Sequence, residues 1–467
     1  MYAEAVRLSR WTHVYKSDLS YFALYHSLNM EVVFLERKLY PIIKLLSLGT
    51  TLENLKKKLG GSSDHLEDVV LELHRTGLIV AVRNNDMALL EEKRINFIFP
   101  PGIETLYLIV ADQCNLRCKY CFVLNNMPKE YKQTLMPLHV AKEAIDMFFK
   151  NISMNPAQYS NTPKAIYFYG GEPFINFHVI KHSVEYIEST YSKEVSAMGD
   201  KFRISIVTNG TLVTEGIAKF IASRKNIHVA ISIDGPQEVH DAMRKKEDGQ
   251  GSFAEAIRGC QLLKQAGKDD VALSSTVSSH NIDKLPLLLE LNRQYGFASI
   301  NLNPLTETAS SSVGKRYMRK VSKKMLEYFE LAREDGVYED RVMRKVKAFM
   351  NKRIHVHDCQ GLGAQLVCAP DGQLGICHEG VGMRQFFFGR VSKEFDFHHN
   401  PLIAEWKTRT PLNMPQCFDC PAIGVCGGGC AYGAWLRNGS IWAVDDRFCT
   451  HSLATLQWLI WDLFKNL

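Results

Sequence analysis

The feature that most constrains this chain is a group of three cysteines within eight residues, Cys114, Cys118 and Cys121. Gaps of three and two residues place three thiolates on one short loop, directly after the apolar run Leu106–Val110. A [4Fe–4S] cluster normally takes four thiolates. Three ligands without a fourth nearby leave one iron open to a group that is not protein. A zinc site is the alternative, because zinc also uses C-x2-C pairs, but it prefers a fourth ligand close by.

The spacing C-x3-C-x2-C after a strand resembles the signature of the radical S-adenosylmethionine (SAM) enzymes. This resemblance implies that Cys114, Cys118 and Cys121 bind a [4Fe–4S] cluster whose open iron takes the amino and carboxylate groups of SAM. It also implies that one electron from the cluster cleaves SAM to a 5′-deoxyadenosyl radical.

Composition and charge are those of an ordinary soluble protein. Of the 467 residues, 46% are hydrophobic and 23% are charged, and the formal net charge is +6. The first residues lack the basic-then-apolar pattern of a signal peptide, and no apolar run is long enough to span a membrane. We therefore expect a cytoplasmic protein that has neither a membrane nor a nucleic acid as its partner.

The twelve cysteines are spread unevenly: three lie at 114–121, one is Cys260, and eight lie between Cys359 and Cys449. Because the cytosol keeps thiols reduced, disulfides are not expected, and the clustering favours metal centres. Cys260 lies in a helical pattern, which predicts a small buried apolar residue.

The chain divides by pattern into four parts. Its first hundred residues contain short apolar strands and three helical patterns, which predict a winged-helix-like arrangement. Between Thr105 and Asn303, six strands alternate with helices, which predicts a parallel sheet curling into a partial β/α barrel. The predicted fold class is α/β, with a winged-helix-like domain over 1–100, a partial (β/α)6 barrel over 101–310, a helical bridge over 311–358 and a loop-rich C-terminal domain over 359–467.

Further motifs follow later strands, at the end of the barrel where active-site groups are expected. In Tyr169-Gly170-Gly171-Glu172-Pro173, the glycines permit close backbone approach, and Glu172 is suited to meet an ammonium group. After a C-x3-C-x2-C strand, this segment resembles the family motif that holds the methionyl amino group of SAM. Arg244 stands where many family members place an arginine, which implies a role on the SAM carboxylate, with a surface salt bridge as the alternative. The SAM site implied by the resemblance comprises Gly170, Gly171, Glu172, Pro173, Asn209, Ser232, Asp234 and Arg244.

The C-terminal cysteines form a second pattern, in which Cys359-x12-Gly372-x4-Cys377 precedes Cys417-x2-Cys420-x5-Cys426-x3-Cys430-x18-Cys449. The pattern resembles the SPASM extension of radical SAM enzymes, which houses two auxiliary [4Fe–4S] clusters. This resemblance implies that the nearer cluster is bound by Cys359, Cys377 and Cys430. The second cluster is then bound by Cys417, Cys420, Cys426 and Cys449. Cys368 is not part of the pattern. We expect it to complete the nearer cluster, and otherwise that cluster has an open iron able to bind substrate.

SPASM-bearing enzymes mostly modify peptides and proteins, and the first hundred residues look like the leader-recognition element of enzymes that mature ribosomally made peptides. The predicted function is therefore a radical SAM peptide maturase that installs a thioether or carbon–carbon crosslink. Its cofactors would be SAM and three [4Fe–4S] clusters, and its partners a precursor peptide with a leader and an electron donor such as flavodoxin or ferredoxin. One alternative is a sulfatase-maturing type enzyme that oxidises Cys or Ser, and a remote one is a zinc-binding regulator of nucleic acid.

Overall fold

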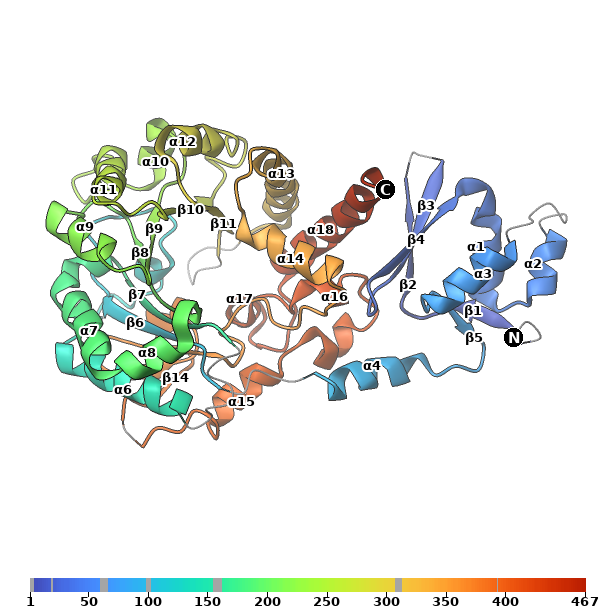
Figure 1. Ribbon diagram of the computed structural model, residues 1–467, viewed down its shortest axis with the longest axis horizontal. Helices are drawn as coiled ribbons and strands as arrows, with labels where there is room; N and C mark the ends of the chain where they lie inside the picture. The colour runs from blue at the N-terminus through green and yellow to red at the C-terminus, as the bar shows by residue number, and fades with distance from the viewer. Residues whose placement is uncertain are drawn as a thin grey trace.

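A large barrel and a smaller N-terminal part make up the molecule (Figure 1). The computed structural model describes residues 4–17, 20–58, 66–97, 102–153, 162–306, 313–392 and 394–467. The domain boundaries expected at 100/101 and 310/311 fall outside these residues. No helix in the described ranges is long and apolar enough to cross a membrane.

Six parallel strands form the barrel wall, as the alternating pattern predicts. In the sheet they follow the order β11-β10-β9-β8-β7-β6, which is the reverse of the chain order. Their apolar residues face helices on one side and the barrel interior on the other, so the strands read as nearly continuous apolar runs. The strands are β6 (Thr105–Ala111), β7 (Lys164–Gly170), β8 (Phe202–Thr208), β9 (Ile227–Ser232), β10 (Ala272–Val277) and β11 (Ile300–Pro304).

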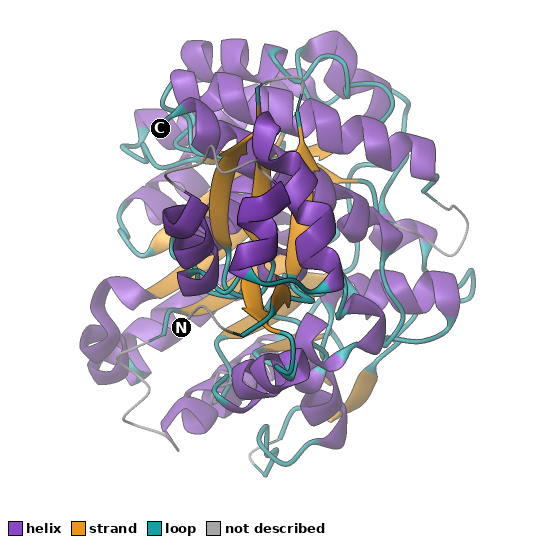
Figure 2. Ribbon diagram, turned by 90° about the vertical axis from the view of Figure 1, so that its right-hand side faces the viewer, coloured by secondary structure: helices purple, strands orange, loops and turns teal. Residues whose placement is uncertain are grey.

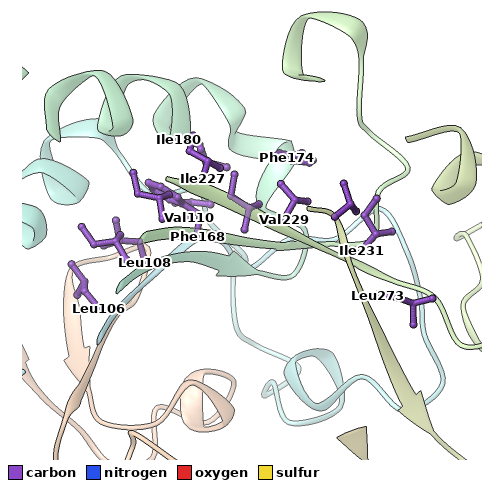
Figure 3. Packing of buried hydrophobic residues seen from close by; sticks show 14 of the residues in the cluster. Leu106, Leu108, Val110, Phe168, Phe174, Ile180, Ile227, Val229, Ile231 and Leu273 are labelled. Carbon is purple, nitrogen blue, oxygen red and sulfur yellow. The ribbon is translucent and has the colours of Figure 1, made fainter. Parts of the chain in front are cut away.

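Helices cover the outer face of this wall (Figure 1). Leu108, Val110, Phe168 and Ile180 belong to a single buried cluster that fills the space between strands and helices (Figure 3). The main covering helices are α6 (Leu138–Ser153), α7 (Phe177–Thr190), α9 (Glu215–Ala222), α11 (Phe253–Gln265) and α12 (Leu287–Tyr295). Cys260 of α11 is 0% exposed, in agreement with its prediction as a buried apolar residue.

The C-terminal part extends the barrel sheet, which the sequence patterns did not predict. Strand β12 (Gln365–Cys368) pairs in parallel with β6, and β13 (Gln373–Gly375) and β14 (Phe387–Arg390) follow as antiparallel neighbours. The sheet therefore has nine strands rather than six. Residues beyond Cys359 consequently share one hydrophobic core with the barrel.

The N-terminal part contains an antiparallel sheet of β2 (Thr12–Lys16), β3 (Tyr21–His26) and β4 (Glu31–Glu36). Its helices are α1 (Tyr40–Leu48), α2 (Leu52–Lys58) and α3 (Leu66–Arg75), and short strands β1 (Val6–Leu8) and β5 (Ile79–Ala81) pair beside them. Figure 2 views the molecule from this side. Three helices thus accompany two small sheets, which are the element types that the sequence patterns indicate.

Both faces of the N-terminal sheet are covered. Phe22 and Leu24 of β3 face α1 to α3, and the alternate residues Ala23 and Tyr25 pack against the C-terminal part. The elements on that second side are α14 (Asp340–Met350), α16 (Ile423–Cys426) and α18 (Asp446–Lys465). Helix α4 (Asp86–Ile95) continues the contact along the bottom of Figure 1, with Arg94 donating to Asn413 at 3.0 Å.

Candidate active site and metal centres

The cysteine loop follows β6 and is held in place by a neighbouring segment. Backbone N–H groups of Arg117 and Lys119 donate to the carbonyls of Lys245 and Met243 at 2.6 and 3.0 Å. Two thiols also accept backbone hydrogen bonds, from Leu116 to Cys114 and from Leu124 to Cys121, each at 3.4 Å. Donors of this kind stabilise the thiolate form, which is the form that binds metal.

The end of β7 lies tightly against the end of β6. A Cβ atom on Gly170, whose φ is 151°, would lie 1.9 Å from the Ala111 carbonyl oxygen. One on Gly171 would lie 2.2 Å from the Gln113 carbonyl oxygen. The predicted close backbone approach is therefore made to the strand that carries the cysteine loop, and the same glycines line the pocket described below.

The Glu172 carboxylate joins the ends of β7 and β8. One oxygen accepts hydrogen bonds from the Thr208 hydroxyl at 2.6 Å and the Phe174 N–H at 3.0 Å, and the other accepts from the Asn209 N–H at 2.7 Å. Burial raises the pKa of Glu172 to about 7, against the effect of these hydrogen bonds. The side chain is 0% exposed and does not line the pocket. Its position does not support the predicted contact with an ammonium group.

Arg244 forms a buried ion pair rather than a surface salt bridge. Its Nε and Nη2 donate to Asp234 at 3.0 and 3.2 Å, and the guanidinium lies 5.4 Å from the centre of the Tyr120 ring. The Tyr120 hydroxyl and the Thr276 N–H donate to the same carboxylate. Asp234 is therefore fully engaged behind the site, which leaves Nη1 of Arg244 for a ligand.

One pocket of about 360 Å³ collects most of the predicted site. A volume of that size suits a small-molecule ligand. Of the residues predicted to hold SAM, those that line it are Gly170, Gly171, Asn209, Ser232 and Arg244, together with Cys114, Cys118 and Cys121. Glu172, Pro173 and Asp234 are absent from the lining.

Several lining residues were missed by sequence reasoning. Ser274, Thr276 and Asn303 belong to the last two barrel strands, where the rule that sites lie at strand ends would have found them. Tyr120 stands between two of the predicted cysteine ligands. The far side of the pocket is formed by the C-terminal part, through Arg341, His378, Glu379, Cys430, Arg447, Phe448 and His451.

The three cysteines assigned to the nearer auxiliary cluster come from separate segments and meet beside the pocket. The pKa values of the Cys377 and Cys430 thiols are well above their usual range because of burial and the nearby Glu379 carboxylate, and Cys359 acts on both thiols. The Cys430 thiol accepts from the Gly433 N–H at 3.2 Å, at the start of α17 (Ala431–Asn438). His378 stacks on Tyr107 of β6 at 4.7 Å, which fixes this group to the barrel.

The other four cysteines gather under the N-terminal part. Burial and then the neighbouring thiols Cys426 and Cys420 raise the pKa of Cys417 to about 12, and Cys449 lies within range of the same three groups. Cys420 and Cys426 pack against the cluster that contains Tyr25 of β3. The two sets of thiols thus lie in different places, one beside the pocket and one beneath the N-terminal sheet.

Cys368 lies apart from both sets. It is 0% exposed at the end of β12, opposite Leu108 of β6, and its thiol contacts the Ala369 carbonyl at 3.6 Å. The charged groups around it are Asp371, Arg384 and Glu143 rather than thiols. This position in the barrel core argues against the predicted role of Cys368 as a cluster ligand.

Across the described part of the chain, no three His, Cys, Asp or Glu side chains are close enough to share one metal ion. The thiols of each set therefore stand further apart than the ligands of a single ion would. Binding of iron would require the raised pKa values of these thiols to be overcome, with release of their protons.

Comparison with known proteins agrees with this geometry. Residues 108–291 match the radical SAM superfamily. The chain is 23% identical to the radical SAM cyclopropyl synthase TigE of Paramaledivibacter caminithermalis, over 95% of this chain and 93% of that protein. Its fold is similar to that of hexahistidine-tagged anSMEcpe with bound AdoMet (TM-score 0.64, 19% identity, 79% of this chain and 96% of that one).

A second solved structure also covers the N-terminal part. Streptococcus suis SuiB bound to the precursor peptide SuiA has a TM-score of 0.56 and 14% identity, over 95% of this chain and 99% of that one. The cysteine loop at the end of β6, the parallel barrel and the match over residues 108–291 lead to one conclusion. The chain is an enzyme that contains a radical SAM domain over residues 108–291.

Proposed function

We propose that this enzyme modifies a ribosomally made precursor peptide by installing a crosslink, either thioether or carbon–carbon. The observation that carries the proposal is the shared pocket, in which the cysteine loop of the barrel faces Cys430 and Glu379 of the C-terminal part. Similarity to SuiB, solved with its precursor peptide, supports a peptide substrate, and the relative TigE is named a cyclopropyl synthase. The TigE name favours the carbon–carbon alternative.

The donor set of the cysteine loop fits a [4Fe–4S] cluster with one open iron, because three thiols share one loop and two of them accept backbone N–H groups. When bound there, the cluster and SAM would supply the 5′-deoxyadenosyl radical that removes a hydrogen atom from the peptide. The backbone of Gly170 and Gly171 would hold the methionyl end of SAM. Arg244 would offer its Nη1 to the SAM carboxylate, and Asn209 and Ser232, which line the pocket, would reach hydroxyl groups.

The remaining cysteines would hold two auxiliary clusters, for a total of about twelve irons at four per cluster. Cys359, Cys377 and Cys430 would hold the one beside the pocket, where it is placed to accept the spare electron of the reaction. Flavodoxin or ferredoxin would deliver the starting electron. Chemical analysis of iron and sulfide after anaerobic reconstitution tests the count, and replacing Cys114, Cys118 and Cys121 with Ala should remove four irons and all SAM cleavage.

The leader peptide would add as a strand to the open edge of β4. In the described residues, β4 pairs only with β3, and Arg75 of α3 lies within electrostatic range of Glu31 at the start of β4. The Arg37 N–H donates to the Ser20 carbonyl at 2.7 Å, so that pair is hydrogen-bonded. Because bonded and non-bonded pairs alternate, the backbone N–H of Val32 points away from β3 and toward an added strand.

Two proline substitutions test this docking edge. Val32→Pro removes the outward donor on β4, and Val14→Pro does the same on the opposite edge, since Val14 faces Leu24 across β2 and β3. We expect Val32→Pro to weaken binding of the precursor about tenfold and Val14→Pro to leave it unchanged. Binding is measured by fluorescence anisotropy, with SAM cleavage in the absence of peptide as the control. Equal affinity in Val32→Pro and the parent protein would show that β4 does not take the leader.

Point substitutions are preferable to deletion of the N-terminal part. Deletion would expose Phe349, Val425 and Leu456, which are buried against β3. A truncated protein would therefore lose stability for reasons unrelated to peptide binding.

A sulfatase-maturing enzyme, the alternative function, would not need an N-terminal domain that binds a leader peptide. The match to anSMEcpe covers 79% of this chain, whereas those to TigE and SuiB cover 95%. This difference supports the peptide maturase over the enzyme that oxidises Cys or Ser on a protein. Mass spectrometry of a candidate precursor peptide, after incubation with reconstituted enzyme and SAM, would show a loss of two hydrogens for a crosslink.

A further inference from the structure

The nearer auxiliary set has only three thiols, so a cluster bound there lacks a fourth ligand from cysteine. Cys359 joins this set from one side: a Cβ atom on Gly361 would lie 3.4 Å from the Cys359 sulfur and 3.7 Å from the carbonyl oxygen that precedes Cys377. Cys430 reaches the set from the start of α17. Cys368, which the sequence analysis expected as the fourth ligand, lies instead in the barrel core.

A carboxylate lies beside this set of thiols. Glu379 follows Cys377 by two residues in a single helical turn, His378–Val381, and it lines the same pocket as Cys430. Its charge acts on the thiols of Cys359, Cys377 and Cys430 alike, so the carboxylate lies within electrostatic range of all three.

The positive charges of Arg447 and Arg341 act on this carboxylate, but in the described residues it has no direct partner. None of them makes a hydrogen bond or an ion pair with the Glu379 side chain. The two arginines nearby are already engaged: Arg447 donates to both oxygens of Asp445 at 2.9 and 2.6 Å, and Arg341 donates to the Leu302 carbonyl and the Asn303 side chain. Glu379 is only partly exposed, and withdrawing a carboxylate from water is unfavourable unless it coordinates a metal or meets another cation.

We propose that Glu379 supplies the fourth ligand of the auxiliary cluster held by Cys359, Cys377 and Cys430. This inference rests on the proposed function, which places a cluster there. A carboxylate is a harder donor than a thiolate and binds iron–sulfur clusters less firmly. The iron that Glu379 would hold would therefore be the one whose protein ligand is most readily exchanged.

The experiment starts from the full-length protein in which Cys114, Cys118 and Cys121 are all Ala, so that only auxiliary clusters contribute. Into this parent are introduced Glu379→Ala, Glu379→Gln, which has nearly the same shape, and Glu379→Cys. Cys368→Ala is the matched control, since it removes the other candidate ligand. Each protein is reconstituted anaerobically, and its iron content and the electron paramagnetic resonance spectrum of its reduced form are measured with and without added cyanide.

We expect Glu379→Ala and Glu379→Gln to alter one of the two auxiliary signals and to let cyanide change it at concentrations that leave the parent unaffected. Glu379→Cys should restore protection against cyanide, and Cys368→Ala should match the parent in iron content and spectrum. Parent-like spectra and cyanide response in both Ala and Gln variants would overturn the role of Glu379. A change in Cys368→Ala alone would assign the ligand to that cysteine. A parent protein without iron would overturn the auxiliary clusters themselves, which is a different failure.

Discussion

At the scale of single residues, the site depends on how closely β7 approaches β6. Two features of Gly170 disfavour a larger residue: its φ is positive, and a Cβ atom there would lie 1.9 Å from the Ala111 carbonyl oxygen. Gly249 has a φ of 83°, but a Cβ atom there would meet nothing within 4 Å, so it shares only the first feature. The pair therefore separates backbone strain from steric conflict.

Gly170→Ala should lower the free energy of unfolding by about 3 kcal/mol or more, since strain and steric conflict add. Gly249→Ala should lower it by only about 1 kcal/mol, the cost of strain. Chemical denaturation of both variants under anaerobic conditions measures the difference. Equal losses would mean that the backbone around Ala111 yields to an added methyl group.

Glu172 makes the stability of the folded protein depend on pH, in a direction that follows from its raised pKa. Burial raises its pKa in the folded state to about 7, whereas in the unfolded chain it titrates near its ordinary value of 4.5. Between these values the folded state binds more protons, so this residue makes stability fall as pH rises from 4.5 to 7. One pKa unit corresponds to about 1.36 kcal/mol, so the free energy of unfolding falls by about 3 kcal/mol over this range.

Glu172→Gln should remove that dependence. Relative to the parent, the variant should gain about 3 kcal/mol of stability between about pH 4.5 and about pH 7.5. Urea denaturation at both pH values measures the change, and subtraction of the parent cancels all other titrating groups. Parallel curves for the two proteins would show that the carboxylate stays charged throughout, held by Thr208 and Asn209.

The residue motifs found in the sequence include the three cysteines and five of the predicted SAM residues that line the pocket, because cysteine spacing and strand ends are local features. Arg244 was found in this way, but its buried pairing with Asp234 depends on two segments meeting in space. Glu379 was not found, because a single acid after Cys377 carries no pattern of its own. The place of Cys368 on β12 could not be predicted, since its position between two expected ligands in the sequence says nothing of the strand that it joins.

At the scale of elements, β12 brings the two cysteine sites against each other. Val367 of β12 is buried with Val123, which follows the cysteine loop, and with Val381, which follows Cys377. The six barrel strands were predictable because each is an apolar run between turns. Strand β12 was not, because it has only four residues and its pairing with β6 is not visible in the sequence.

Val367→Thr tests this contact with little change in shape. The buried hydroxyl should lower the free energy of unfolding by about 1–3 kcal/mol, because no partner is at hand for it. Val82→Thr, at a side chain that is 47% exposed, should change it by less than about 0.5 kcal/mol. Thermal denaturation compares the two, and similar melting temperatures would show that the contact between the sites is loose.

At the scale of the whole molecule, the N-terminal part shares its core with the rest. Trp11 and Leu28 are buried with Leu412 and Ile423 of the C-terminal part, and Arg10 pairs with Asp419 at 2.6 Å. Strands β2 to β5 and helices α1 to α3 of the N-terminal part were predictable from the order of its apolar segments, whereas β1 and α4 were not. Its docking was not, because each contact joins residues several hundred positions apart.

Leu28→Ala should lower the melting temperature of the complete protein in a single transition, at a cost of roughly 2–5 kcal/mol. Leu28 is 1% exposed at the shared core, whereas Leu48 is 78% exposed, so Leu48→Ala serves as the control. Scanning calorimetry distinguishes one transition from two. An early separate transition for the N-terminal part would show that it unfolds independently.

The loop from Cys417 to Cys426 lies beneath the N-terminal part, and this position has a consequence for protein engineering. Gly424 of that loop leaves room for the Ser27 carbonyl, since a Cβ atom there would lie 2.6 Å from it, and Asp419 is held by Arg10. A hybrid that receives its first hundred residues from a relative would keep its fold only if the loop from Cys417 to Cys426 were exchanged with them. Substrate range in such hybrids would be inherited as this two-segment unit.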